Sequence, residues 1–278
     1  MKIAVMGDLH YPSRNGVTKR LEEHIIESRD SFYPNYLKSF FNQEADLYVS
    51  VGDLTNFGTK DEFEEVYEYI RSYNKPFYQT LGNHDVYSMP RREILELTKM
   101  NENFVIEEDD VVLLFLETGR ELDTFNFDGW VTNEQLEWLE KVIDGSGEKT
   151  MIVFAHHPIY DTTARSNQDM LSIHPSIDLW SVLNKKRGKG IYVNGHTHED
   201  SIVEKENWAF VQISAVLDDQ SVRILELDHD QVSVTTIDVS DDESMKQATT
   251  IGNALERFTL FPDGVGTTLN RNKSIKIR

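Results

Sequence analysis

Side chains that bind metal ions and phosphate follow directly after several apolar runs of this chain. The clearest case is residues 81–85, where Gly82 is followed by Asn83, His84 and Asp85. Glycine lets the backbone approach a bound group closely, and the next three side chains offer an amide oxygen, an imidazole and a carboxylate. Such a set suits metal and phosphate chemistry, but an Asn-His-Asp string in a turn is usually only solvated. The prediction therefore depends on the other runs.

Four other apolar runs end in side chains of the same kinds. Every donor is a nitrogen or an oxygen, because the chain has no cysteine and thiolate ligands are excluded. Residues two apart in an extended chain point the same way, so such a pair can converge on one ion. The donors are Asp8 and His10 after residues 2–6, Asp53 after residues 46–51, His156 after residues 151–155, and His196 and His198 after residues 191–193.

Helices with an apolar stripe separate several of these strands. One is expected to open at Ser31, with Pro34 in its first turn, where proline is tolerated. Others begin at the capping boxes of Thr59, Thr132 and Ser240. Repeated alternation of strand, loop and helix is typical of a layered α/β fold whose loops gather at the carboxyl ends of the strands.

Two stretches depart from this alternation. Residues 104–117 read as a hairpin around an acidic turn, and residues 201–237 contain four short strand-like runs that fit a second antiparallel group. Residues 241–278 are interpreted as a helix and a basic tail packed on a domain formed by residues 1–240. The tail could pair with a strand, lie on acidic surface or be disordered, and the sequence leaves these alternatives open.

The composition excludes several classes of partner. The chain has 278 residues, with 28 Lys and Arg against 48 Asp and Glu, a formal net charge of −20. This charge opposes the basic surface that binding of a nucleic-acid polymer requires. The apolar run at residues 3–6 is too short for a signal peptide, and no apolar segment approaches membrane-spanning length. We expect a cytoplasmic protein without a membrane partner, and the oligomeric state is left open.

The five segments together resemble the calcineurin-like metallophosphoesterases, over residues 2 to about 215. Residues 52–55 and 156–158 are most similar to class III cyclic-nucleotide phosphodiesterases. The resemblance implies a four-layer αββα sandwich with mixed sheets. The Ser/Thr protein phosphatases of this superfamily carry arginines in the second and third motifs, but this chain has no arginine in residues 54–58 or at position 81.

The resemblance also implies the roles of the site residues. Two metal ions, divalent or of mixed valence, would be drawn from Mn, Fe, Zn, Co and Ni, which nitrogen and oxygen ligands suit. His84 would protonate the leaving oxygen or stabilise the transition state, and Asp85 would orient its ring. Both are candidate catalytic residues. One metal would be held by Asp8, His10, Asp53 and His198, and the other by Asp53, Asn83, His156 and His196.

A long polar loop follows His156, and a loop in that position often shapes a substrate pocket. Its Arg165 could contact a phosphate, although a solvated loop arginine is the more common case. His157 points away from His156 in an extended chain and is interpreted as a packing or supporting residue.

The function implied is a dinuclear-metal phosphoesterase that hydrolyses a small phosphodiester, a cyclic nucleotide or similar, by attack of a metal-bridging hydroxide. A phosphomonoesterase or a nucleotide pyrophosphatase on the same site are the alternatives. A non-catalytic interaction scaffold of the same fold is a third.

Overall fold

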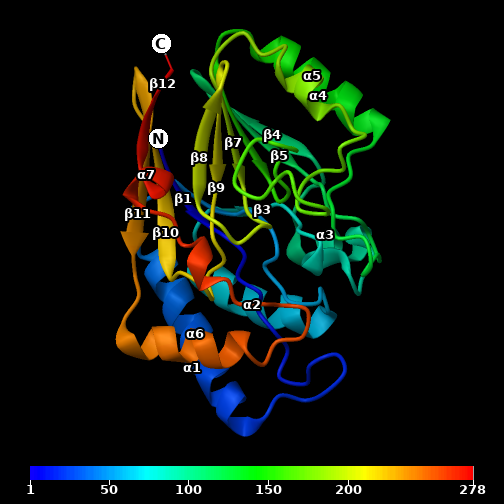
Figure 1. Ribbon diagram of the computed structural model, residues 1–278, viewed down its shortest axis with the longest axis vertical. Coiled ribbons are helices and arrows are strands. Elements are labelled where there is room, and N and C mark those ends of the chain that lie inside the picture. Colours follow the sequence, from blue (N-terminus) through cyan, green and yellow to red (C-terminus); the bar gives the residue numbers. More distant parts are fainter. Residues whose placement is uncertain (278) are drawn as a thin grey trace.

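Two six-stranded mixed sheets form the centre of the structure, a computed structural model that describes residues 1–277 (Figure 1). The first sheet contains β1 (Lys2–Met6), β2 (Leu47–Ser50), β3 (Phe77–Gln79), β10 (Ser221–Leu227), β11 (Gln231–Asp238) and β12 (Lys273–Lys276). The second contains β4 (Phe104–Glu107), β5 (Val111–Leu116), β6 (Thr150–Ala155), β7 (Gly190–Asn194), β8 (Ser201–Lys205) and β9 (Trp208–Gln212). The strand orders are β12-β11-β10-β1-β2-β3 and β4-β5-β6-β7-β9-β8.

Helices cover the outer face of each sheet. The helices are α1 (Glu23–Phe41), α2 (Lys60–Ser72), α3 (Arg91–Thr98), α4 (Asn133–Ser146), α5 (Leu179–Leu183), α6 (Asp242–Gly252) and α7 (Thr268–Arg271). One apolar core joins α1, α2, α3 and α6 to the first sheet, and another joins α4 and α5 to the second. A third core lies between the sheets, where Ile3 and Val49 pack with Phe154. The predicted four-layer αββα sandwich is therefore confirmed.

Helix α1 begins at Glu23, well before the predicted start at Ser31. Its first turns read as polar loop because they contain Arg29, whose guanidinium is buried and donates to the carbonyl of Pro12 at 2.6 Å. Pro34 consequently lies in the interior of the helix rather than in its first turn. The contact between Arg29 and Pro12 joins the early part of α1 to the loop after β1.

The four strands of residues 201–237 do not form one antiparallel group. The hairpin β8–β9 joins the second sheet, where β9 runs parallel to β7. The hairpin β10–β11 joins the first sheet, where β10 runs antiparallel to β1. The strand positions were predictable from alternation, but the sheet that each hairpin joins depends on long-range pairing. The hairpin predicted within residues 104–117 is confirmed as β4–β5.

The C-terminal segment packs on the first sheet and its helical layer and provides the sheet's edge strand. Helix α6 lies against α1, and β12 pairs with β11, so the tail adopts the first of the three alternatives (Figure 1). The helix begins one residue later than expected, because Asp241 rather than Ser240 accepts the hydrogen bond that caps it, from the backbone N–H of Ser244 at 2.7 Å. The division at residue 240 stays a prediction. No helix within residues 1–277 is long and apolar enough to cross a membrane.

Parallel strands of both sheets end at the same side of the molecule. Strands β1, β2 and β3 run parallel in the first sheet, and β6 and β7 in the second. The loops after these strands carry all the predicted metal ligands. Because the two sheets pack face to face, these loops meet above the core between them.

Candidate metal centre

The structure brings the seven predicted metal ligands together at the carboxyl ends of β1, β2, β3, β6 and β7. Donor atoms of Asp8, His10 and His198 lie within 4.8 Å of one another, as do those of Asp8, Asp53 and His156. All of these side chains are buried apart from His198, which is partly exposed. The remaining two ligands, Asn83 and His196, both contact His156. Five distant segments thus share one site.

Backbone carbonyls set which ring nitrogen of each histidine faces the site. Nδ1 of His156 lies 3.0 Å from the carbonyl oxygen of Val51, and Nε2 of His196 lies 2.9 Å from that of Met170. A carbonyl oxygen only accepts hydrogen bonds, so these two nitrogens carry protons. The opposite nitrogen of each ring, which faces the site, therefore has a free lone pair when the ring is neutral.

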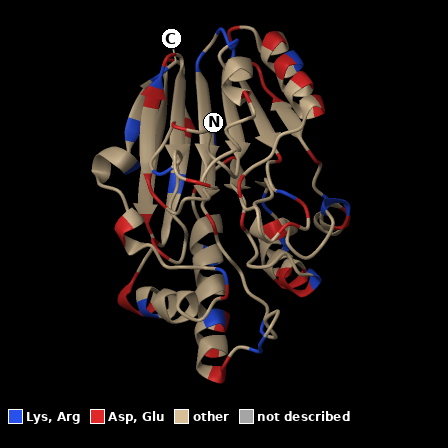
Figure 2. Ribbon diagram, turned by 45° about the vertical axis from the view of Figure 1, so that its right-hand side comes forward, with Lys and Arg blue, Asp and Glu red and all other residues tan. Residues whose placement is uncertain are grey.

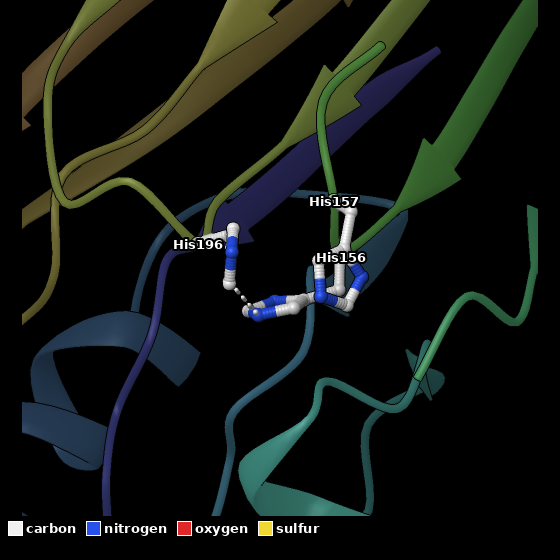
Figure 3. A group of neighbouring side chains, drawn as sticks. All are labelled: His156, His157 and His196. Atoms are coloured by element: carbon white, nitrogen blue, oxygen red, sulfur yellow. Dashed lines mark hydrogen bonds between the residues drawn. The ribbon is translucent and has the colours of Figure 1, made fainter. Parts of the chain in front are cut away.

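Four electron-rich atoms converge at one point: Nε2 of His156 and the three atoms nearest to it. Its Nε2 lies 3.2 Å from Asp53 Oδ2, 3.1 Å from Asn83 Oδ1 and 3.2 Å from His196 Nδ1. Asn83 donates its amide to Tyr87 Oη at 2.6 Å, which turns its oxygen inward. Figure 3 shows the rings of His156 and His196 meeting at this contact. Neutral rings would leave no proton among these four atoms, so the donor set fits a cation.

The pKa values of His156 and His196 also indicate that these donor atoms favour a positive charge among them. Burial lowers the pKa of His156, but the nearby carboxylates of Asp53 and Asp8 outweigh burial and raise it to about 9. A proton on this ring therefore supplies part of the charge that a metal ion would supply. Burial and the positive charge of His156 lower the pKa of His196 to about 3, which keeps the ring of His196 neutral.

A second group of donors is formed by Asp8, His10 and His198. His198 Nε2 is 3.2 Å from Asp8 Oδ2 and 3.2 Å from His10 Nε2. Asp8 Oδ1 and His10 Nδ1 are buried and have no hydrogen-bond partner within residues 1–277. Asp53 Oδ2 is 3.9 Å from His10 Nε2 and also contacts His156. One carboxylate oxygen therefore faces both groups, as a bridging ligand would.

His84 lies beside these two groups, and one of its ring nitrogens is already hydrogen-bonded. Its Nδ1 lies 2.7 Å from the carbonyl oxygen of Asn56, so Nδ1 carries the proton and Nε2 is available. Its ring packs edge-on against His10 with centroids 4.6 Å apart, and its backbone N–H donates to Asp53 Oδ1 at 2.8 Å. His84 thus holds Asp53 through the backbone and presents Nε2 at the site.

Asp85 does not orient the His84 ring, and the predicted role is wrong. The carbonyl of Asn56 does so instead. Asp85 accepts hydrogen bonds from the backbone N–H groups of Thr55 at 2.8 Å and Gly82 at 3.0 Å, and from the Thr55 hydroxyl at 2.7 Å. Burial raises the pKa of Asp85 to about 6. Its structural effect is to join the loops that follow β2 and β3.

Both ring nitrogens of His157 form hydrogen bonds with neighbouring residues. Nδ1 lies 2.8 Å from Thr118 Oγ1, and Nε2 lies 3.0 Å from the carbonyl oxygen of Phe127. Its ring stands nearly perpendicular to that of His156 and packs 4.3 Å from that of His196 (Figure 3). His157 therefore supports His196 and is not available as a ligand.

Backbone strain is concentrated in the ligand loops. Residues other than glycine rarely adopt positive φ, and such conformations cost about 1–3 kcal/mol each, so they persist where surrounding structure enforces them. Four predicted ligands have positive φ: His10 at 50°, Asp53 at 45°, His196 at 72° and His198 at 57°.

Glycines allow the loops to approach the ligands closely. A Cβ atom on Gly82 would lie 2.1 Å from Asp53 Oδ1, and one on Gly195 would lie 2.0 Å from Asp8 Oδ1. Any side chain at these positions would therefore displace a carboxylate. Gly82 and Gly195, which precede two of the ligand clusters, therefore have a steric function, and not only a role in forming a turn.

An open cleft of about 420 Å³ leads to the metal centre. Its walls include His84, the loop that carries Arg165, and Arg257 with residues 259–261, which follow α6. Phe258 packs on the rings of His10 and His198, with centroids 4.7 and 5.1 Å away. No sequence pattern predicts this wall, because these residues neither follow a strand nor form a spaced donor set. Arg165 is partly buried there rather than solvated.

The family model described as "Calcineurin-like phosphoesterase" matches residues 1–200, which contain every predicted ligand. The chain belongs to the calcineurin-like phosphoesterase family. Arg257 and residues 259–261 of the cleft wall lie beyond the part that this family model covers.

Curated relatives of this phosphoesterase-family protein are distant. A probable glycerophosphodiester phosphodiesterase from Arcobacter nitrofigilis is 32% identical over 163 residues, 57% of each chain. A probable cyclic nucleotide phosphodiesterase from Fibrobacter succinogenes is 26% identical over 215 residues, which are 74% of this chain and 76% of that protein. The chain thus spans little more than half the length of the first of these relatives.

Among solved structures, a dimetal phosphatase from Danio rerio superposes with a TM-score of 0.67. The match covers 86% of this chain and 99% of that chain at 14% sequence identity. This likeness establishes the fold that the two chains share.

Proposed function

We propose that this protein is a dinuclear-metal phosphodiesterase that hydrolyses small phosphodiesters. The observation that carries the proposal is the position of Asp53 Oδ2, which lies 3.2 Å from His156 Nε2 in one donor group and 3.9 Å from His10 Nε2 in the other. Membership of the calcineurin-like phosphoesterase family supports the reaction class, and the two relatives named as phosphodiesterases support a diester.

Each metal would take a share of the seven ligands. Two cations held there would polarise the phosphoryl group and lower the pKa of a coordinated water, and the ligand set admits Mn, Fe, Zn, Co or Ni. One cation would be held by Asp8, His10, Asp53 and His198, and the other by Asp53, Asn83, His156 and His196.

The protein's own groups position and protonate the reacting ester. His84 keeps its Nδ1 proton on the Asn56 carbonyl, so Nε2 is the atom at which it gains a proton and passes it to the leaving oxygen. Phe258 covers the rings of His10 and His198 and limits the access of water to that side. The peptide N–H of His84 holds Asp53 in place while the ester reacts.

Two aryl esters that release the same chromophore test the proposal. With Mn²⁺, we expect a higher kcat/KM for bis-p-nitrophenyl phosphate than for p-nitrophenyl phosphate, and no turnover in Asp53→Ala. Arg92→Gln, which changes an exposed side chain of α3, is the control. Preference for the monoester would overturn the diesterase assignment. Inactivity towards both esters, with no metal retained, would favour a non-catalytic scaffold.

A hydrolysis screen separates the remaining substrate classes. The same Mn²⁺-loaded sample should cleave cyclic nucleotides or glycerophosphodiesters faster than nucleoside diphosphates. The opposite order would make the protein a nucleotide pyrophosphatase. The metal content, measured on the same sample, links activity to the site.

A further inference from the structure

Two arginines line the cleft without a carboxylate in ion-pair contact, although the Glu199 carboxylate interacts with Arg165 at longer range. Arg165 donates to the backbone carbonyl of Thr197 at 2.9 Å, and Arg257 donates to that of Thr124 at 2.8 Å. Neither forms an ion pair within the described part of the chain. This is unusual here, because eight of the other ten arginines in residues 1–277 pair with a carboxylate.

The negative net charge of the protein makes it unexpected that these two guanidinium groups form no ion pair. The chain carries 48 acidic side chains against 28 basic ones, and Figure 2 shows Asp and Glu spread over the outer helices and loops. An arginine in such a protein readily finds a carboxylate on the surface. Two that remain unpaired in one cleft provide local positive charge for an anionic ligand.

Arg165 is held directly beside the metal centre. Thr197, whose carbonyl it contacts, is the residue between the predicted ligands His196 and His198. Its guanidinium also lies over the ring of Phe261, 4.4 Å from the centroid. The group is thereby fixed in orientation, and its other N–H donors remain for a planar, bidentate contact with a phosphate or carboxylate.

Arg257 is positioned by its neighbours on the segment after α6. The next residue, Phe258, packs on His10 and His198, and the carbonyl of Glu256 accepts a hydrogen bond from Asn56 Nδ2 at 3.2 Å. These contacts place Arg257 in the wall of the cleft although its own side chain is exposed.

Both arginines also have a strained backbone. Arg165 and Arg257 have φ of 60° each, in the left-handed region that arginine rarely adopts. Such outliers persist where surrounding structure enforces them, and they cluster at ligand sites. Two in one cleft, on segments far apart in the sequence, are consistent with selection for a ligand.

We propose that Arg165 and Arg257 form an anion subsite beside the metal centre, which selects phosphodiesters that carry a second phosphate-like group. The inference rests on the proposed function and adds the substrate class to it. The metals would engage the scissile phosphate, and the two guanidinium groups would bind the second anion on the part of the substrate that remains after cleavage. Since Arg257 lies beyond residues 1–200, this selectivity would be a property of this chain rather than of the matched family segment.

Two diesters that differ only in one anionic group test the subsite. Propyl p-nitrophenyl phosphate and 3-phosphonopropyl p-nitrophenyl phosphate react with water identically. A P–O bond to water forms, the bond to p-nitrophenolate breaks, and an alkyl phosphate remains. We expect the holoenzyme to prefer the phosphonate ester by about tenfold or more in kcat/KM, as a charged, hydrogen-bonded contact provides.

The preference ratio of the variants decides the proposal. It should fall towards one in Arg165→Gln and in Arg257→Gln, and stay unchanged in the control Arg92→Gln, whose side chain is 83% exposed on α3. Arg257 is exposed, so its variant keeps the test decisive if Arg165→Gln fails to fold. A ratio near one in the wild type, or an unchanged ratio in both variants, would overturn the subsite.

A binding measurement separates failure of the subsite from failure of the proposed function. Calorimetric titration of the metal-loaded protein with propyl phosphate and with 3-phosphonopropyl phosphate should show tighter binding of the latter, by a margin that Arg165→Gln and Arg257→Gln reduce. If neither ester is hydrolysed but this difference in affinity holds, the proposed function fails and the subsite stands. If both esters are hydrolysed and the affinities are equal, only the subsite fails.

Discussion

The substitution Gly82→Ala tests whether the close approach of the loops determines the geometry of the metal centre. A Cβ atom at this position would lie 2.1 Å from Asp53 Oδ1 and 2.4 Å from the Asp53 backbone nitrogen, whereas ordinary contact begins at 3.4 Å. The Asp53 carboxylate must therefore move by about 1 Å, the size of displacement that costs catalysis about 100-fold. Overpacking of this kind also lowers the free energy of unfolding, by about 1–3 kcal/mol.

Gly145→Ala is the matched control for this substitution. Gly145 lies near the end of α4, and a Cβ atom there would meet nothing within 4 Å. Because alanine favours a helix over glycine, the control should gain about 0.5–1 kcal/mol of stability. Activity and metal content should not change.

Three measurements on the two variants decide the matter. They are kcat with bis-p-nitrophenyl phosphate, metal bound per chain by mass spectrometry, and the free energy of unfolding from urea titration. We expect Gly82→Ala to lose turnover, metal and stability together. Equal metal content and turnover in Gly82→Ala and Gly145→Ala would refute the steric reasoning.

Three further substitutions follow from the site and its support. His84→Ala should lower kcat by about 100-fold or more while metal content stays unchanged, since His84 is expected to transfer a proton rather than bind metal; loss of metal would make it a ligand. Phe258→Ala should lower the free energy of unfolding in urea by about 3–5 kcal/mol, because a buried ring on His10 and His198 is removed; a loss under 1 kcal/mol would contradict that packing. Burial raises the pKa of Glu117 to about 8, so the folded protein holds a proton that the unfolded chain loses near pH 4.5, and stability should fall as pH rises between these values. Glu117→Gln should flatten this fall in urea titrations at pH 5 and pH 8, and an unchanged slope would assign it to other groups.

Much of the fold was predictable because its signals are local. The capping boxes of Thr59 and Thr132 mark the starts of α2 and α4, and both form as expected. The apolar runs that become β1, β2 and β6 are followed by their donor residues at the strand ends. Parallel strands that end at one edge then bring the donors together, so the gathering of ligands follows from topology alone.

The remaining features depend on contacts between distant segments. The early part of α1 buries Arg29 against the loop that contains Pro12, and the separation of β8–β9 from β10–β11 depends on sheet pairing. Three of the four hydrogen bonds that Asp85 accepts come from the loop after β2, about thirty residues away in the chain, so adjacency to His84 was misleading. Residues 257–261 reach the cleft only because α6 packs on α1 and directs the chain back across the site.

The central claim is that five chain segments hold two cations that share Asp53. Anomalous X-ray diffraction from crystals of the protein loaded with Mn²⁺ tests it most directly. We expect two anomalous peaks about 3.5–4 Å apart, one on each side of the Asp53 carboxylate. A single peak, or peaks that do not contact Asp53, would contradict the account.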